Sequence, residues 1–258
     1  MLSKIKKIIS KKKKSKIICL TSYSKNIAEE IDKYTDIVLV GDSLGSVLYN
    51  YKTTRKVTLQ NIIDHSRSVR MGVKKSLMVV DMPYQTYRNK SEAIRNVRKV
   101  IKLTKCDAVK LEGGRKIKKV IEHLVKNKIQ VLGHLGLLPQ SVRGRFKFKG
   151  KTDFEKKQIF KDAQLLEKIG VFGIVLECVE KNLAKKISNS ITIPTIGIGS
   201  SVHCDGQVLV TDDILGLNKT KIKFVKKFVD LKKVINIGVK KFRSEVISRK
   251  YPSAKHSY

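Results

Sequence analysis

The sequence predicts an α/β fold, a single barrel of eight parallel strands with helices around it. Eight short runs of β-branched and other apolar residues recur along the chain, and IVLVGD, LMVVDM and GIVLEC are almost continuously apolar. Strands buried on both faces of a parallel sheet have this composition. Polar segments with helical periodicity separate the runs. A chain of 258 residues has the usual length of one TIM (β/α)8 barrel.

The expected elements alternate in the order that β/α units require. The expected strands cover residues 17–23, 37–43, 76–82, 108–113, 130–135, 173–178, 192–197 and 207–211. The expected helices include residues 25–33, 59–71, 91–103, 115–127, 153–169 and 182–188. An open Rossmann-like sheet is the alternative. No G-x-G-x-x-G motif follows the first strand, so the barrel is favoured.

Three stretches depart from this alternation. Residues 1–16 are expected to form a short helix and a basic segment ahead of the barrel domain, residues 17–258. The stretch between Pro139 and Thr152 is too long for a simple turn and predicts a loop over one end of the barrel. The part after Lys219 predicts one or two basic helices within the same domain.

The formal net charge of +34 favours weak binding of phosphates at low salt. Lysine is nevertheless spread over the whole chain rather than gathered on one element, a pattern typical of a solvated surface with a compositional bias. No nucleic-acid-binding module or aromatic stacking platform is recognisable. We therefore expect no specific nucleic-acid partner.

Cysteine usage and the N-terminal sequence bear on the compartment. The four cysteines, Cys19, Cys106, Cys178 and Cys204, form no CxxC pair, which indicates reduced thiols. The N-terminal residues lack a signal-peptide pattern, and no run of about 18 apolar residues occurs. These features predict a cytoplasmic location and no membrane partner.

Five consecutive expected strands each end in polar or ionisable groups. At the carboxyl ends of barrel strands such groups surround one mouth, the face that carries the active site. A single acid after a strand is commonly a turn or helix-capping residue, but five ends in a row indicate a site. The residues are Asp42 and Ser43, Asp81, Lys110 and Glu112, His134, and Glu177.

The four carboxylates in this set predict a metal ion. Burying them together is costly unless a cation or protons neutralise them. Oxygen ligands without a His/Cys cluster favour Mg²⁺, which commonly takes one or two carboxylates directly and keeps several waters. Asp42 and Asp81 are therefore expected to bind Mg²⁺ directly, with Glu112 reaching it through water or at longer distance. The remaining positions suit a chelating 2-oxo acid.

The other strand-end groups have two readings each. Lys110 precedes Glu112 by two positions, so both side chains point to the same face of the strand; Lys110 holds a substrate carboxylate, pairs with a neighbouring acid, or does both. His134 is a substrate contact or a structural histidine. Glu177 is a general base or a further metal-binding or structural carboxylate. The glycine-rich stretch 197–201 is a weak signal for an anion-binding loop.

The motifs together resemble those of the ketopantoate hydroxymethyltransferase family. The matching stretches run in order over nearly the whole chain. They include LVGDSLG at 39–45, VVDMPYQTY at 79–87, VKLEGG at 109–114, GHLGLLPQSV at 133–142, IPTIGIG at 193–199 and DGQVLV at 205–210. The chain departs from the family's usual pattern at Leu138, Arg143 and Ser200-Ser201.

The resemblance implies a TIM barrel, a homodecamer and a reaction. Its substrate would be 2-oxoisovalerate, its one-carbon donor 5,10-methylenetetrahydrofolate, and its product ketopantoate, a precursor of pantothenate and coenzyme A. The resemblance assigns Mg²⁺ binding to Asp42, Asp81 and Glu112, and substrate contacts to Asp42, Ser43, Asp81 and Lys110. It makes Glu177 the proton acceptor.

Two alternatives remain at this point. Another Mg²⁺-dependent enzyme that forms enolates of 2-oxo acids, of the phosphoenolpyruvate mutase and isocitrate lyase type, would also place acids at strand ends. Such enzymes typically carry a mobile catalytic loop, often with a cysteine, which is not recognisable in this sequence. A non-catalytic nucleic-acid-binding protein would use the positive charge, but the acids in the mouth would repel phosphates.

Overall fold

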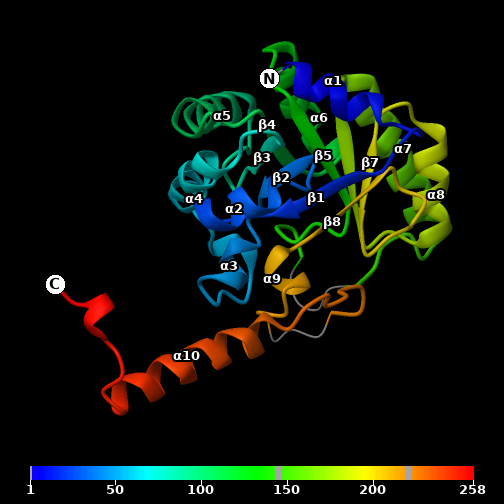
Figure 1. Ribbon diagram of the computed structural model, residues 1–258. Coiled ribbons are helices and arrows are strands. Elements are labelled where there is room, and N and C mark those ends of the chain that lie inside the picture. The colour runs from blue at the N-terminus through cyan, green and yellow to red at the C-terminus, as the bar shows by residue number, and fades with distance from the viewer. Residues whose placement is uncertain (1, 143–146, 219–221) are drawn as a thin grey trace. The chain divides into compact units, whose positions relative to one another are not determined.

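A computed structural model describes residues 2–142, 147–218 and 222–258. It contains a closed barrel of parallel strands in sequence order, in which β1 pairs with both β2 and β8 (Figure 1). The predicted TIM barrel is confirmed, and the open-sheet alternative is wrong. The strands are β1 (Ile17–Thr21), β2 (Ile37–Val40), β3 (Leu77–Asp81), β4 (Ala108–Glu112), β5 (Val131–Gly136), β6 (Gly173–Glu177), β7 (Thr195–Ile198) and β8 (Gly206–Leu209).

Helices precede, separate and follow the strands along the described chain. They are α1 (Leu2–Ser10), α2 (Lys25–Ile31), α3 (Leu44–Val47), α4 (Leu59–Gly72), α5 (Lys90–Thr104), α6 (Lys118–Lys126), α7 (Asp153–Ile169), α8 (Lys181–Ser190), α9 (Thr211–Ile214) and α10 (Leu231–Ile247). Three short 3₁₀ helices are η1 (Thr54–Lys56), η2 (Arg115–Ile117) and η3 (Ala254–His256).

Local sequence explains most of the element boundaries. Thr58, Asn89 and Thr152 each accept a hydrogen bond from a backbone N–H of the following helix, so α4, α5 and α7 begin where capping residues stand. The predicted helix at 153–169 has the same bounds in the structure. β7 begins three residues later than predicted, directly after Pro194, because proline has no N–H for the ladder.

The apolar core has two parts. The outward faces of the strands pack against the helices, while alternate residues such as Ile17, Leu77 and Val79 fill the barrel interior. Ile5 and Ile8 of α1 belong to this inner cluster, so α1 closes the amino-terminal end of the barrel, opposite α3 (Figure 1). Because side chains alternate with a period of two, the polar residues at the carboxyl ends of the strands also point into the barrel.

The structure divides into two compact units, Met1–Val210 and Thr211–Tyr258. The first holds the entire barrel. The second holds α9, α10 and η3, and α10 has no buried residue. Residues 143–146 of the predicted loop, which include Arg143, and residues 219–221 lie outside the described residues. No helix among the described residues is both long and apolar enough to span a membrane.

Candidate active site

The strand ends bring the predicted site residues together at the carboxyl-terminal mouth of the barrel. Register pairs Asp81 with Lys110 across β3 and β4, and Glu112 with His134 across β4 and β5. Asp42, Asp81, Lys110, Glu112 and His134 are all buried, while Ser43 and Glu177 are partly exposed. The charged groups therefore lie inside the barrel, with Glu177 and Ser43 nearer to solvent.

Lys110 is the cation at the centre of this group. Its Nζ lies 3.1 Å from Oδ1 of Asp81 and 3.3 Å from Nδ1 of His134. Burial opposes the charge of Lys110, but the neighbouring carboxylates, with Asp81 foremost, outweigh it and raise the pKa of the ammonium. Lys110 and Glu112 face the same interior, as predicted. The ion pair with Asp81 is present, and the substrate role of the ammonium stays a prediction.

His134 links Lys110 to Glu177. Burial, and then the charge of Lys110, lower the pKa of His134, so the ring is neutral at neutral pH. A lysine ammonium can only donate, so Nδ1 accepts and Nε2 carries the proton. Nε2 lies 3.1 Å from Oε2 of Glu177, although the angle does not meet hydrogen-bond geometry. The ring therefore directs its N–H toward the predicted base.

Gly136 fixes how closely β5 approaches Glu177. Its φ is +96°, and a Cβ atom there would lie 2.2 Å from the Glu177 carbonyl oxygen. That oxygen accepts the N–H of Leu137 at 2.8 Å. Only glycine fits this conformation and this contact, which accounts for the second glycine of the Gly-His-Leu-Gly motif.

Ser200 braces the other side of the same strand end. Its hydroxyl donates to the carbonyl of Leu176 at 2.6 Å and accepts the N–H of Val179 at 3.1 Å. Both partners flank Glu177 in sequence. Ser200 belongs to the glycine-rich stretch that the sequence weakly indicates as an anion-binding loop. In the structure its hydroxyl instead binds the backbone on either side of Glu177.

Sequence reasoning missed Gln140 and Tyr87. The Gln140 side chain donates to Oδ2 of Asp42 at 2.8 Å, and its backbone N–H donates to Oε2 of Glu112 at 3.0 Å. The Tyr87 hydroxyl donates to Oε1 of Gln140 at 2.6 Å. Both residues lie inside motifs that match the family, PQS and PYQTY. Those matches are the sequence feature that could have pointed to them as site residues. A second tyrosine, Tyr23, hydrogen-bonds Ser43 at 2.8 Å.

The mouth carries more negative than positive charge. Burial raises the pKa of Asp81 to about 7, even though Lys110 lowers it. Burial and then the charge of Asp42 raise the pKa of Glu112 well above its usual range. Oδ1 of Asp81 is buried without a hydrogen bond of acceptable geometry. Such a carboxylate cluster with one lysine gains from a bound cation.

The donor set fits a hard divalent ion that keeps waters. Among the described residues, no three His, Cys, Asp or Glu side chains are placed to hold a metal ion as a group. The described residues therefore form no preassembled site with three protein ligands. Magnesium is commonly bound through one or two carboxylates, with water and substrate completing the shell, so the carboxylate-rich mouth is compatible with it.

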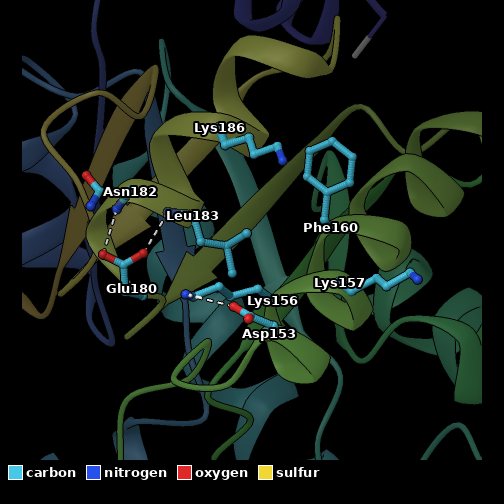
Figure 2. Close-up of a pocket in the computed structure, with 8 residues that line it drawn as sticks. All are labelled: Asp153, Lys156, Lys157, Phe160, Glu180, Asn182, Leu183 and Lys186. Carbon is cyan, nitrogen blue, oxygen red and sulfur yellow. Dashed lines mark hydrogen bonds and ion pairs between the residues drawn. The ribbon is translucent and has the colours of Figure 1, made fainter.

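A separate pocket of about 560 Å³ lies between the amino-terminal halves of α7 and α8 (Figure 2). Its charged groups are mostly engaged. Lys156 pairs with Asp153 at 3.2 Å, Glu180 caps α8, and Lys186 lies over the Phe160 ring at 5.2 Å. None of the predicted site residues lines this pocket, so it is distinct from the barrel mouth.

Comparison with known proteins identifies the family. The family described as ketopantoate hydroxymethyltransferase matches residues 3–254. The chain belongs to the ketopantoate hydroxymethyltransferase family. A Pelagibacter ubique protein named 3-methyl-2-oxobutanoate hydroxymethyltransferase is 62% identical over 258 residues, with 100% of both chains covered. A Rhizobium etli protein of the same name is 44% identical over 246 residues, which cover 94% of this chain and 90% of that one. The predicted family and enzyme class are confirmed.

Solved structures with the same fold are far more distant in sequence. A phosphonopyruvate hydrolase in complex with oxalate and Mg²⁺ matches with a TM-score of 0.65 and 9% identity, covering 98% of this chain and 93% of that one. A 2,3-dimethylmalate lyase of the PEP mutase/isocitrate lyase superfamily matches with a TM-score of 0.61 and 9% identity, over 98% and 96%. These matches establish the fold alone. The family match disfavours both alternative functions.

Proposed function

We propose that this enzyme transfers a hydroxymethyl group from 5,10-methylenetetrahydrofolate to 3-methyl-2-oxobutanoate with the help of Mg²⁺, and so forms ketopantoate for pantothenate synthesis. Family membership over residues 3–254 carries the reaction. The observation that carries the site is the row Lys110–His134–Glu177, held by contacts of 3.3 Å and 3.1 Å beside three buried carboxylates.

In this proposal Asp42 and Asp81 hold Mg²⁺, and Glu112 holds it through water. The support is the excess of buried carboxylates over cations: Asp42, Asp81 and Glu112 are buried beside the single ammonium of Lys110. Bound Mg²⁺ supplies Lewis acidity to the oxygens of the 2-oxo acid, which acidifies the proton on C3.

The chain's own residues orient the substrate and move the proton. The Lys110 ammonium holds the substrate carboxylate, while Ser43 and His134 contact the substrate from neighbouring strand ends. The Glu177 carboxylate takes the proton from C3. The Nε2 atom of His134 faces the Glu177 carboxylate at 3.1 Å, while Nδ1 faces Lys110, so the ring lies between the cation and the base.

The carbon then forms the new bond. Water breaks the two C–N bonds of the methylene unit, which leaves two N–H groups on tetrahydrofolate and the one-carbon unit at the oxidation level of formaldehyde. The electron pair on C3 attacks that carbon, its C=O π bond opens to an alkoxide, and the alkoxide takes the proton from Glu177. We place the folate across the loops that follow the later strands, since these loops surround Glu177 at the mouth.

The proposal also covers the oligomeric state and the cellular location of the enzyme. The enzyme acts as a homo-oligomer, a decamer by family resemblance. Support comes from α10, which carries an exposed apolar stripe at helical spacing, formed by Ile235, Val239, Phe242 and Val246. It works in the cytoplasm, which suits its four free cysteines.

The direct test is product formation. Purified enzyme with 3-methyl-2-oxobutanoate, methylenetetrahydrofolate and Mg²⁺ is expected to form ketopantoate, and omission of the folate or addition of EDTA is expected to stop it. Formation of ketopantoate at an undiminished rate in EDTA would refute the metal. Absence of product from a folded sample with all components would refute the reaction.

A further inference from the structure

Gln140 makes a set of contacts that the chemistry above does not use. It lies in the loop after β5 and is 3% exposed. Its backbone N–H donates to Oε2 of Glu112 at 3.0 Å. Its side-chain amide nitrogen donates to Oδ2 of Asp42 at 2.8 Å and to the carbonyl of Met82 at 3.0 Å. One buried residue thus contacts two of the three proposed metal ligands.

The orientation of the Gln140 amide is fixed by its surroundings. The Met82 carbonyl can only accept a hydrogen bond, so it faces the amide NH₂. The Tyr87 hydroxyl donates to Oε1 of Gln140 at 2.6 Å. A flipped amide would set two oxygens against each other at Met82 and would leave the Tyr87 proton facing nitrogen. The NH₂ group is therefore held toward Asp42.

In each of the three carboxylates of Asp42, Asp81 and Glu112, one oxygen accepts a hydrogen bond from an N–H group. Oδ2 of Asp42 and Oε2 of Glu112 accept from Gln140. Oδ2 of Asp81 accepts the backbone N–H of Asp42 at 3.1 Å. Oδ1 of Asp81 lies 3.1 Å from the Lys110 ammonium, in an ion pair whose geometry falls short of a hydrogen bond. One oxygen of each of these carboxylates is thus held by an N–H group, which fixes the direction of the other oxygen.

We propose that Gln140, oriented by Tyr87, is a positioning residue that sets the Asp42 carboxylate for Mg²⁺. This inference rests on the proposed function, in which Asp42 is a metal ligand. The terminal torsion of an aspartate is broad and roughly two-fold, so an untethered carboxylate can rotate away from the ion. Partners behind a metal ligand orient it, and their loss typically lowers metal affinity by about 10- to 100-fold.

The experiment measures binding of Mn²⁺, as a paramagnetic substitute for Mg²⁺, to the full-length enzyme without substrate. The variant Gln140→Met keeps the length of the side chain and removes its three hydrogen bonds, to Asp42, Met82 and Tyr87, while the backbone N–H to Glu112 remains. We expect it to raise the Mn²⁺ dissociation constant about 10-fold or more. Tyr87→Phe should raise it in the same direction by less. Ser141→Ala, an exposed neighbour on the same loop, is the matched control and should not change it.

A double-mutant cycle tests whether Gln140 acts through Asp42. Asp42→Asn should weaken Mn²⁺ binding, and adding Gln140→Met to it should cause no further change beyond about twofold. Two full, additive losses would overturn the proposal, as would an unchanged dissociation constant in Gln140→Met. If Gln140→Met fails to fold, Tyr87→Phe carries the test, and binding equal to wild type overturns it. If the wild-type enzyme itself binds no Mn²⁺, the proposed metal fails rather than the Gln140 contact alone.

Discussion

The imidazole of His134 meets the carboxylate of Glu177 at 3.1 Å, from Nε2 to Oε2. Lys110 lies on the opposite side of the ring, at Nδ1. Because Lys110 can only donate, Nδ1 accepts, and the proton of the neutral ring is on Nε2. The lysine on β4 therefore determines that the protonated nitrogen of His134 faces Glu177 on β6.

Replacing His134 with Phe should therefore lower kcat more than it raises KM. The phenyl ring keeps the bulk but removes the N–H that faces Glu177. Misplacement of a catalytic group by about 1 Å can cost about 100-fold in rate, and we expect a loss of kcat of about 10- to 100-fold. Steady-state kinetics at saturating Mg²⁺ gives both constants. A change confined to KM would assign His134 to substrate binding alone.

Lys110→Met should weaken binding of 3-methyl-2-oxobutanoate. A hydrogen bond between an ammonium and a carboxylate contributes about 1.5–3 kcal/mol, so KM is expected to rise by about 10- to 100-fold. KM measured over a range of substrate concentrations checks this. The exposed Lys151, which lies on the loop before α7, offers a matched control, and Lys151→Met should leave KM unchanged. An unaltered KM in Lys110→Met would leave Lys110 with only its ion pair to Asp81.

Asp205 should stabilise the fold at neutral pH and lose that effect in acid. It accepts hydrogen bonds from Lys12 Nζ and from the Thr195 N–H, both at 2.8 Å. Burial raises the pKa of Asp205, but Lys12 and the Thr195 N–H outweigh it and lower the pKa below its usual value. The stabilisation is thus fully present above the unfolded-state pKa of about 3.9 and disappears as pH falls through the lower folded-state pKa.

Urea unfolding of Asp205→Asn tests this dependence. We expect a loss of about 2–4 kcal/mol at pH 7, because a buried charge-assisted pair is broken. The difference from wild type should shrink as the pH falls below about 4. Asp153→Asn, a solvent-exposed carboxylate paired with Lys156, should change stability little. A deficit of Asp205→Asn that stays constant down to acid pH would contradict the ionic origin.

Introducing a charge into the apolar stripe of α10 should reduce self-association. Val239 is 60% exposed and Phe242 is 56% exposed, and burial of such side chains between subunits is the expected driving force. Val239→Glu with Phe242→Glu should lower the mass seen by sedimentation velocity while the far-ultraviolet circular dichroism stays that of a folded barrel. An unchanged mass would place the subunit contacts elsewhere.

The barrel and the inward direction of the site residues could be predicted from the sequence because both follow from periodicity. Apolar runs identify the strands, and the period of two places Lys110 and Glu112 on one face, as the structure has them. The predicted start of β7 at residue 192 is wrong, because the apolar run continues through Pro194 while the strand begins only after that proline, which has no N–H.

The contacts of Gln140 could not be obtained in this way. Gln140 belongs to no strand, and its position depends on how the loop after β5 folds back over Asp42 and Glu112. The tautomer of His134 likewise depends on which neighbour each ring nitrogen meets. Periodicity gives the face of a strand, but it does not give the distance between two side chains from different strands.

The most direct test of Glu177 as the base is exchange of the C3 proton of 3-methyl-2-oxobutanoate in D₂O, followed by NMR with enzyme and Mg²⁺ but without folate. We predict rapid exchange by the wild-type enzyme, its loss in EDTA, and a fall of about 100- to 10,000-fold in Glu177→Gln, with Mn²⁺ binding retained in that variant. Exchange by Glu177→Gln at a rate close to that of wild type would contradict the assignment of Glu177 as the proton acceptor.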